Sequence, residues 1–343
     1  MLIDKLLSSI KALNLNLTGK IVLTEAASGA YSVTPVLAAL AGAKVFAYSR
    51  ASYYGSVSEI FKNTRKIYQN TDRLLDIEYI DNLTPEVISQ ADIITNSGHL
   101  RPLDKEKLQY AKDDVVIPLM YEAWEWRDAD IDLPYSRARG IRIAATNERH
   151  ADVDVFNYLG DMAVKQILDA GLSLYNNSFV LICNNDFGPY IAKVVSKMCK
   201  YLGVVDLREN KARYPIGSID WIGDFPEISI PEKFREAEAI IFTAYPFNKV
   251  WIGENAPIRI ETLKSAFNHP YILRYAGDVD CYSLESAKVR YFPRDVKSGH
   301  MGILPSAVGY DPIIRLQAGG LKVGEALLSG NYRHNNDTLL QLV

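Results

Sequence analysis

The chain has 343 residues, of which 48% are hydrophobic and 23% are charged, and its formal net charge is −3. This composition is typical of a globular protein of two domains and argues against general nucleic-acid binding, and the lack of an apolar run of about 18 residues argues against a membrane partner. Three cysteines, Cys183, Cys199 and Cys281, lack CxxC spacing, which favours free thiols in a reducing cytoplasm and predicts no metal site.

Strands and helices alternate through the first half of the chain. Residues 1–16 predict a helix, and residues 19–50 predict a strand, a turn, a helix and a second strand. Apolar residues at helical spacing over 151–170 predict a long helix that carries the chain into a second unit. Such alternation predicts a parallel sheet with helices on both faces. The elements predicted between these segments are strands at 77–80, 91–97 and 115–120, helices at 84–89 and 104–111, and a helix and strand over 131–146.

The second unit begins with the clearest motif of the chain. Residues 179–206 predict a strand, a tight turn, a helix and a second strand that ends in an acidic residue, which is the outline of a dinucleotide-binding βαβ unit. We therefore predict an α/β protein with two Rossmann-like, doubly wound parallel-sheet domains and an interdomain cleft. The expected segments are 1–165 for a flavodoxin-like or Rossmann-like substrate domain, 166–315 for a nucleotide-binding domain, and 316–343 for C-terminal helices that pack back on the first domain.

The turn of this βαβ unit has lost most of its glycine. If Gly188 is the last glycine of a GxGxxG motif, Cys183 and Asn185 occupy the first two glycine positions, and Pro189 follows in the helix. A Cβ at those positions keeps backbone N–H groups away from a phosphate. Asp186 beside a pyrophosphate would be repulsive. A plain strand-to-helix turn capped by Asn185 and Asp186 is therefore at least as good an interpretation as a phosphate site.

An acidic side chain stands where the second strand of the unit ends. Asp206 lies 18 residues after Gly188, close to where a carboxylate would meet a ribose 2′-hydroxyl. Arg208 could instead favour a 2′-phosphate, so NAD and NADP both stay open as cofactors. The alternative is that Asp206 is a solvated strand end.

Several spaced patterns resemble the D-2-hydroxyacid dehydrogenases of the formate and glycerate dehydrogenase type. Residues 131–141 resemble a segment before the family's interdomain helix, 237–264 the strand and proline turn beneath the nicotinamide, and 277–284 the family's RGxxVDxxxL segment. The stretch 299–307, GHMGILPSA, resembles the family's PHIAGAT segment and places His300 at the position of the catalytic histidine. Together the patterns cover roughly residues 90–330.

The resemblance implies an NAD(P)-dependent oxidoreductase. His300 would be the acid/base that exchanges a proton with a carbonyl oxygen while hydride moves at the nicotinamide, with Tyr245 and Pro246 beside the cofactor. The alternative is that His300 is a structural histidine in a loop with glycines on both sides. The resemblance also implies a homodimer.

Departures from the family pattern affect the expected active site. Tyr275 occupies the position of the family's substrate-binding arginine, and Arg274, one residue earlier, is the candidate substitute. Tyrosine cannot make the bidentate contact that a carboxylate receives from arginine. Glu285 is the nearest counterpart of the glutamate that pairs with the histidine. A bulky segment, 121–127, replaces the family's glycine-rich loop, so we expect a small-molecule substrate that is not a simple 2-hydroxyacid.

Candidate substrate residues come from the first domain. Trp124, Trp126 and Arg127 would line a pocket, with ordinary packing as the alternative, and His99 follows a strand whose carboxyl end would face the ligand crevice. Two functions stay open. One is an NAD(P)-dependent oxidoreductase that acts on an unknown hydroxy or keto metabolite. The other is a degenerate dehydrogenase scaffold that binds a metabolite, or catalyses a non-redox step, without nicotinamide.

Overall fold

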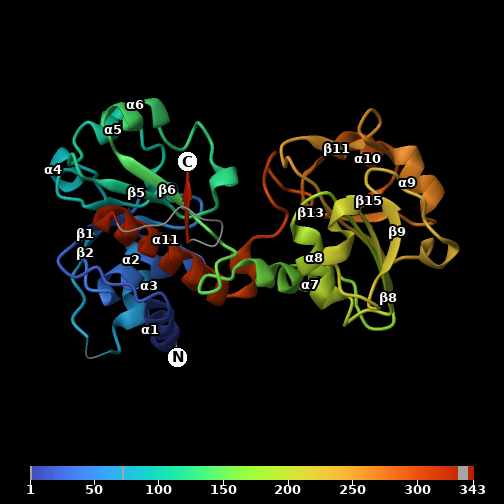
Figure 1. The fold of residues 1–343 in the computed structure, drawn as a ribbon, viewed down its shortest axis with the longest axis horizontal. Helices are drawn as coiled ribbons and strands as arrows, with labels where there is room; N and C mark the ends of the chain where they lie inside the picture. Colours follow the sequence, from blue (N-terminus) through green and yellow to red (C-terminus); the bar gives the residue numbers. More distant parts are fainter. Residues whose placement is uncertain (1, 72, 331–338) are drawn as a thin grey trace. The chain divides into compact units, whose positions relative to one another are not determined.

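A computed structural model describes residues 2–71, 73–330 and 339–343 of the chain. The chain forms two compact units, one of Met1–Val155 with Gly309–Val343 and the other of Phe156–Val308. Each unit is a sheet with helices on its faces (Figure 1). The boundary expected at residue 165 falls inside helix α7 (Leu159–Asp169), which lies wholly in the second unit.

The first unit is built on a seven-stranded sheet with the order β16-β6-β5-β4-β1-β2-β3. Neighbouring strands are parallel, except that β16 pairs with β6 in the antiparallel direction. The C-terminal strand thus returns to the edge of the first sheet. The strands are β1 (Ile21–Glu25), β2 (Lys44–Tyr48), β3 (Ile77–Ile80), β4 (Ile93–Ile94), β5 (Val116–Leu119), β6 (Arg142–Thr146) and β16 (Leu340–Leu342).

Helices cover both faces of this sheet because its strands are apolar on both sides. Val22 of β1 faces a core shared with α1, α2, α3 and α11, whereas the next residue, Leu23, faces a second core shared with α4, α5 and α6. The two groups of helices lie on opposite sides of the sheet (Figure 1). The helices are α1 (Leu2–Ala12), α2 (Val33–Leu40), α3 (Val57–Tyr68), α4 (Pro85–Ile88), α5 (Lys105–Leu108), α6 (Leu133–Ala138) and α11 (Asp311–Ser329).

The second unit is built on a six-stranded parallel sheet with the order β15-β13-β10-β7-β8-β9. A small parallel sheet of three strands, β12-β11-β14, belongs to the same unit. The strands are β7 (Ser178–Cys183), β8 (Tyr201–Asp206), β9 (Asp220–Asp224), β10 (Ala239–Thr243), β11 (Val250–Gly253), β12 (Ile258–Arg259), β13 (Tyr271–Ala276), β14 (Asp278–Val279) and β15 (Arg290–Phe292).

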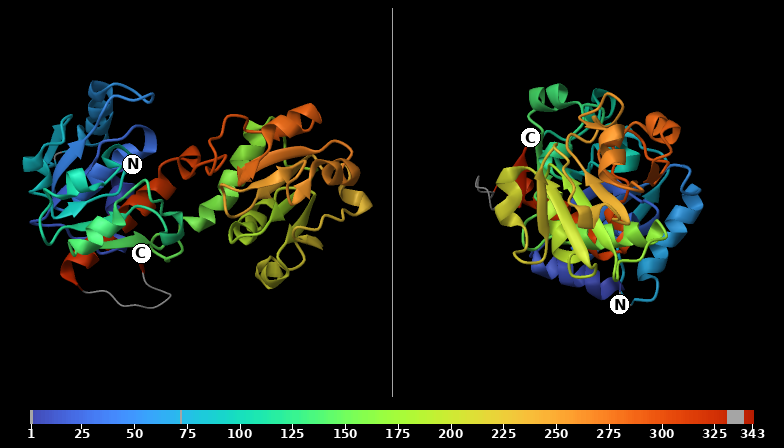
Figure 2. Two further views of the ribbon diagram at one scale, coloured as in Figure 1. Left: turned by 90° about the horizontal axis from the view of Figure 1, so that it is seen from above. Right: turned by 90° about the vertical axis from the view of Figure 1, so that its right-hand side faces the viewer.

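The central strands of this sheet are buried on both faces. Val180 and Ile182 of β7 pack in a core with residues of α9 and α10, and helix α8 buries Ile191 and Ala192. Continuous apolar runs such as FVLIC are typical of parallel strands that have helices on both faces. The helices are α7, α8 (Phe187–Val195), α9 (Ile260–Ala266) and α10 (Cys281–Ser286), and the turned views of Figure 2 show them around the sheet.

The strand orders explain where a ligand would bind. When strands are numbered within their own unit, each set of six parallel strands has the order 3-2-1-4-5-6, which is the doubly wound order. The predicted α/β class with two Rossmann-like domains is therefore confirmed. The direction of winding reverses between β1 and β4 in the first unit and between β7 and β10 in the second, and ligands bind beyond the carboxyl ends of strands at such points.

Among the described residues, no helix has the length and apolar character needed to cross a bilayer.

Candidate functional site

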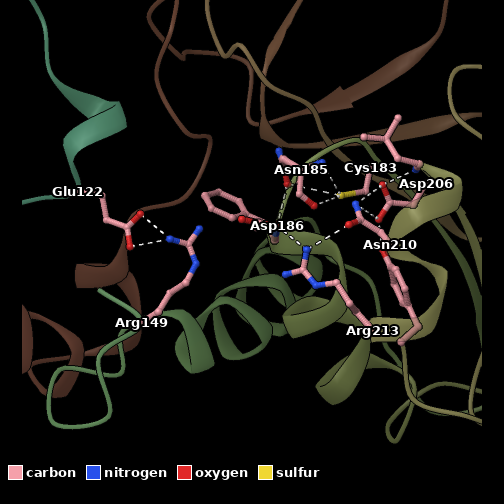
Figure 3. Close-up of polar contacts among 11 residues, drawn as sticks. Glu122, Arg149, Cys183, Asn185, Asp186, Asp206, Asn210 and Arg213 are labelled. Atoms are coloured by element: carbon pink, nitrogen blue, oxygen red, sulfur yellow. Dashed lines mark hydrogen bonds and ion pairs between the residues drawn. The ribbon is translucent and has the colours of Figure 1, made fainter. Parts of the chain in front are cut away.

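The turn after β7 satisfies its own backbone donors (Figure 3). The N–H of Asn185 donates to Cys183 Sγ at 3.4 Å, and the N–H of Phe187 donates to Asn185 Oδ1 at 3.0 Å. The N–H of Gly188 also bonds to the Cys183 sulfur. Asn185 Nδ2 reaches across to Thr243 Oγ1 on the neighbouring strand at 3.1 Å. The amides of Asn185 and Phe187, in the turn where a glycine-rich motif would hold a phosphate, are thus bonded to side chains of the protein.

A carboxylate occupies the start of helix α8. Asp186 pairs with Arg213 Nη1 at 2.5 Å, and the same nitrogen donates to Asn210 Oδ1 at 3.1 Å. The positive end of a helix dipole favours an anion, and here Asp186 is that anion. A pyrophosphate at this place would meet a negative charge.

Asp206 lies at the end of β8, as the sequence predicted, but its carboxylate is fully buried rather than solvated. It accepts hydrogen bonds from Leu207 N at 2.6 Å, Asn210 Nδ2 at 3.3 Å and the Tyr214 hydroxyl at 2.5 Å. Burial raises the pKa of Asp206, and these hydrogen bonds oppose the rise. Arg208, the residue expected to favour a 2′-phosphate, is exposed.

The Tyr214 hydroxyl fills the space between Gly188 and Asp206. A Cβ on Gly188 would lie 2.0 Å from that hydroxyl oxygen and 3.1 Å from Asp206 Oδ2. Tyr214 itself is 4% exposed, and Pro189 is buried in α8. Because the amides of the turn and the carboxylate are bonded within the protein, this arrangement does not fit a nicotinamide dinucleotide.

Arg274 points into the protein. The residue is 2% exposed, and its guanidinium donates to Gly277 O at 3.1 Å, to Val296 O at 3.2 Å and to the carboxylate of Asp278. A substrate carboxylate would have to compete with all three acceptors. Tyr275, at the position of the family's arginine, is fully buried and donates its hydroxyl to Leu159 O at 3.0 Å.

The segment that carries His300 is tied to this buried ion pair. Asp278 accepts from the Ser298 hydroxyl and from Gly299 N at 3.1 Å. Beyond His300, which is exposed, Gly302 N donates to Tyr275 O at 2.8 Å, and a Cβ on Gly302 would lie only 1.8 Å from Arg274 O. The two glycines around His300 therefore make close backbone contacts: Gly302 with β13 and Gly299 with the Asp278 carboxylate.

The remaining predicted residues of the second unit, Glu285, Tyr245 and Pro246, do not share hydrogen-bond partners with His300 or Arg274 in the contacts described. Glu285 accepts from the Tyr291 hydroxyl at 2.8 Å and lies 4.0 Å from Arg294. Tyr245 follows β10 and is 46% exposed, and its N–H donates to Asn184 Oδ1 at 2.7 Å. Pro246, next to it, is also exposed.

In the first unit, a buried carboxylate follows β5. Glu122 is fully buried, and its two carboxylate oxygens accept from Arg149 Nη1 at 2.6 and 2.8 Å (Figure 3). Glu122 also accepts from Trp124 Nε1 at 2.6 Å and from Glu148 N at 3.1 Å. Three donor groups make four hydrogen bonds to this carboxylate, and one of these bonds holds the Trp124 side chain. Trp126 Nε1 is buried without a hydrogen-bond partner among the described residues, and Arg127 is exposed.

Two further carboxyl groups lie beside Glu122. Glu125 and Glu148 share a hydrogen bond, and burial raises the pKa of Glu125 to about 7 and the pKa of Glu148 well above its ordinary value. Burial and the charges of Glu148, Glu125 and Glu25 raise the pKa of Tyr31 to about 12. Perturbed groups at the carboxyl ends of strands are typical of functional sites, and of ion-pair networks as well.

His99 lies at the same edge of the first sheet. Its N–H donates to Glu25 Oε2 at 2.7 Å, and its Nδ1 is 3.3 Å from the Ser49 hydroxyl. His99 is among the site residues predicted from the sequence, whereas Glu122 and Glu148 are not, although both follow predicted strands. Tyr214 is also not among them, and the sequence offers no signal for it.

Comparison with known proteins supports the fold. No family model and no curated protein matches the sequence. Among solved structures, the A chain of dipicolinate synthase from Bacillus subtilis is 13% identical, with 93% of this chain and 100% of that chain covered and a TM-score of 0.58. A D-lactate dehydrogenase from Treponema pallidum is 11% identical over 94% and 100% of the two chains, with a TM-score of 0.52.

A third structure, D-lactate dehydrogenase with NAD+ from Lactobacillus jensenii, is 13% identical over 94% and 99% of the chains, with a TM-score of 0.50. At these identities the likeness is one of fold. At that level, the resemblance to the D-2-hydroxyacid dehydrogenases predicted from the sequence is confirmed, and the chain has their two-domain fold.

Proposed function

We propose that this chain is a dehydrogenase-type scaffold that binds a small metabolite, or catalyses a non-redox step, without a nicotinamide dinucleotide. The turn after β7 carries the proposal. Its amides are bonded to Cys183 and Asn185, and the carboxylate of Asp186 stands at the helix start. A pyrophosphate requires free N–H groups and is repelled by a carboxylate.

Cofactor titration into the full-length chain tests this proposal. We expect no saturable binding of NADH or NADPH up to millimolar cofactor, measured by nicotinamide fluorescence and by calorimetry. The matched control is Asp206→Ala, which would weaken any binding that uses the carboxylate. Saturation of the wild type at micromolar cofactor, weakened in Asp206→Ala, would overturn the proposal.

The second candidate is an NAD(P)-dependent oxidoreductase with His300 as acid/base, acting on a hydroxy or keto metabolite. Its support is the exposed position of His300 on a segment anchored to Asp278, and the carboxylate of Asp206 at the end of β8. Trp124, Trp126, Arg127 and His99 are the proposed substrate residues under either function. If the cofactor titration favours this candidate, His300→Gln should abolish turnover while cofactor binding is kept.

A further inference from the structure

A cavity of about 340 Å³ lies beside helix α7 in the second unit. Its volume falls in the range of about 300–1,000 Å³ that is typical of small-molecule sites, which are mostly apolar with a few polar groups. The lining has the same character and consists of Gln166, Asp169, Phe292, Gly302, Ile303, Leu304, Ser306 and Ala307. None of these residues belongs to the turn after β7 or to the first unit, so a site here is additional to the proposed function and does not depend on it.

One buried polar atom of this lining lacks a hydrogen-bond partner. Gln166 is 1% exposed, and its Oε1 accepts no hydrogen bond from the described residues. The orientation of the amide is fixed, because Nε2 donates to Arg274 O at 2.9 Å and a carbonyl oxygen could not take its place there. Buried polar groups are nearly always hydrogen-bonded. The partner that Oε1 lacks is therefore an N–H or O–H donor that the described part of the chain does not supply.

Gly302 brings the amide of Gln166 to the wall of the cavity. Both residues line the cavity, and a Cβ on Gly302 would lie only 3.1 Å from Gln166 Nε2. The amide end of Gln166, and not only its aliphatic stem, thus lies against the backbone of a lining residue. A side chain at position 302 would separate this amide from a molecule in the cavity.

The charges at the cavity favour a neutral ligand. The described lining residues include a carboxylate, Asp169, but no lysine, arginine or histidine, so an anion would be repelled without a cation to hold it. Asp169 is already paired with Lys165, and a cationic ligand would have to displace that lysine. We propose that the cavity binds a small neutral molecule with an apolar body and a hydroxyl or amide N–H, which donates to Gln166 Oε1. The apolar body would pack against Phe292 and Ile303.

Titration of the whole chain with benzyl alcohol tests the proposal, because this probe joins an apolar ring to one hydroxyl. We expect saturable shifts of the Ile303 and Leu304 methyl signals in NMR spectra, with a dissociation constant in the millimolar range that suits so small a ligand. Benzyl methyl ether, which keeps the oxygen without a donor, and benzoate, which is an anion, should bind at least about fivefold more weakly. Absence of saturable binding by benzyl alcohol, or equal binding of the ether, would overturn the proposal.

Substitutions at the cavity test its location and its acceptor separately. Ala307→Trp puts a large ring over the cavity from an exposed position and should abolish binding of benzyl alcohol, whereas Ala212→Trp, at an exposed position outside the cavity, should leave it unchanged. Gln166→Met keeps the length of the side chain without the acceptor, so its affinity for benzyl alcohol should fall to that of the wild type for the ether. If Gln166→Met does not fold, the wild-type probe series and Ala307→Trp decide the question. Unchanged binding by Ala307→Trp would refute the proposal.

Discussion

At the scale of single residues, the turn after β7 shows how side chains can replace a ligand. Glycine leaves backbone N–H groups open to an anion, whereas Cys183 and Asn185 put a sulfur and an amide oxygen against those groups. Asp206 keeps the position of a ribose-binding carboxylate, and Tyr214 supplies the hydroxyl. The scaffold of a nucleotide site is therefore kept, while two amides of its turn and its carboxylate are bonded within the chain.

Removal of the Tyr214 hydroxyl should lower stability. The bond joins a neutral donor to a buried carboxylate, and hydrogen bonds to charged groups are worth about 1.5–3 kcal/mol. We expect Tyr214→Phe to lower the free energy of unfolding by this amount at pH 7, measured by urea denaturation. Tyr175→Phe is the control, because Tyr175 is 88% exposed. A Tyr214→Phe chain as stable as this control would contradict the assigned bond.

Gly302 should tolerate no side chain. A Cβ there would lie 1.8 Å from the backbone oxygen of Arg274, and a backbone atom cannot yield as the end of a flexible side chain can. We expect Gly302→Ala to lower the free energy of unfolding by about 3 kcal/mol or more, seen as a fall in the urea midpoint. Leu304→Ala, in the same segment at a 48% exposed position, should have a much smaller effect. Similar urea midpoints for Gly302→Ala and Leu304→Ala would contradict the close contact between Gly302 and the backbone oxygen of Arg274.

At the scale of elements, one buried ion pair joins β13 and β14 to the segment before His300. Arg274 and Asp278 are both nearly fully buried. Arg274 also donates to Gly277 O and Val296 O, and Asp278 also accepts from Ser298 and Gly299. The arginine expected to hold a substrate carboxylate thus holds a protein carboxylate. Its role in this arrangement is to position the segment on which His300 stands.

Loss of one partner of the Arg274–Asp278 pair should lower the free energy of unfolding. Asp278→Ala leaves a buried guanidinium without its counter-ion, for which about 3–5 kcal/mol of destabilisation is typical. Urea denaturation measures the loss, and Asp220→Ala is the control because the Asp220–Lys233 pair is 41% and 46% exposed and such pairs contribute about 0–1 kcal/mol. The double variant Arg274→Met/Asp278→Leu should recover part of the stability. Equal effects of Asp278→Ala and Asp220→Ala would contradict the burial of the pair.

The sequence predicted those features that hydrophobic periodicity determines. The apolar run before Cys183 and the position of Asp206 at a strand end both follow from the βαβ pattern. The pattern could not predict Tyr214, because its place depends on the path of an irregular segment rather than on a strand or helix. The same holds for Arg274, whose direction is set by Asp278 on the following short strand. The contacts of side chains on irregular segments are therefore the part of the site that the sequence could not predict.

At the scale of the whole molecule, both units repeat one strand order and concentrate polar groups beyond the carboxyl ends of their strands. In the second unit these groups bond to one another, either through hydrogen bonds such as Tyr214–Asp206 or through the ion pair Asp186–Arg213. In the first unit, Glu122 is balanced by Arg149, but Glu125 and Glu148 face each other as a carboxyl pair. Burial and the charges of the neighbouring carboxyl groups raise the pKa of both residues, which favours retention of a proton by the pair.

This carboxyl pair should make stability depend on pH. Burial, with the charge of Glu122 nearby, raises the pKa of Glu125 from its ordinary value of 4.5 to about 7, and Arg127 opposes the rise. The folded chain therefore holds a proton that the unfolded chain releases. The stabilisation of protonated Glu125 is complete below about pH 4.5 and is lost as pH rises through 7.

We expect the contribution of Glu125 to appear as a fall in the urea midpoint between about pH 5 and pH 7.5. Glu125→Gln carries a permanent hydrogen-bonding amide in place of the protonated carboxyl, so its midpoint should fall less over the same window. Glu232→Gln is the control, because the Glu232 side chain is 94% exposed and its substitution should leave the wild-type slope unchanged. Because Glu148 shares the proton and its pKa is also raised, Glu148→Gln should flatten the profile in the same direction. If the wild type and Glu125→Gln lose stability in parallel, the proton resides elsewhere in the chain.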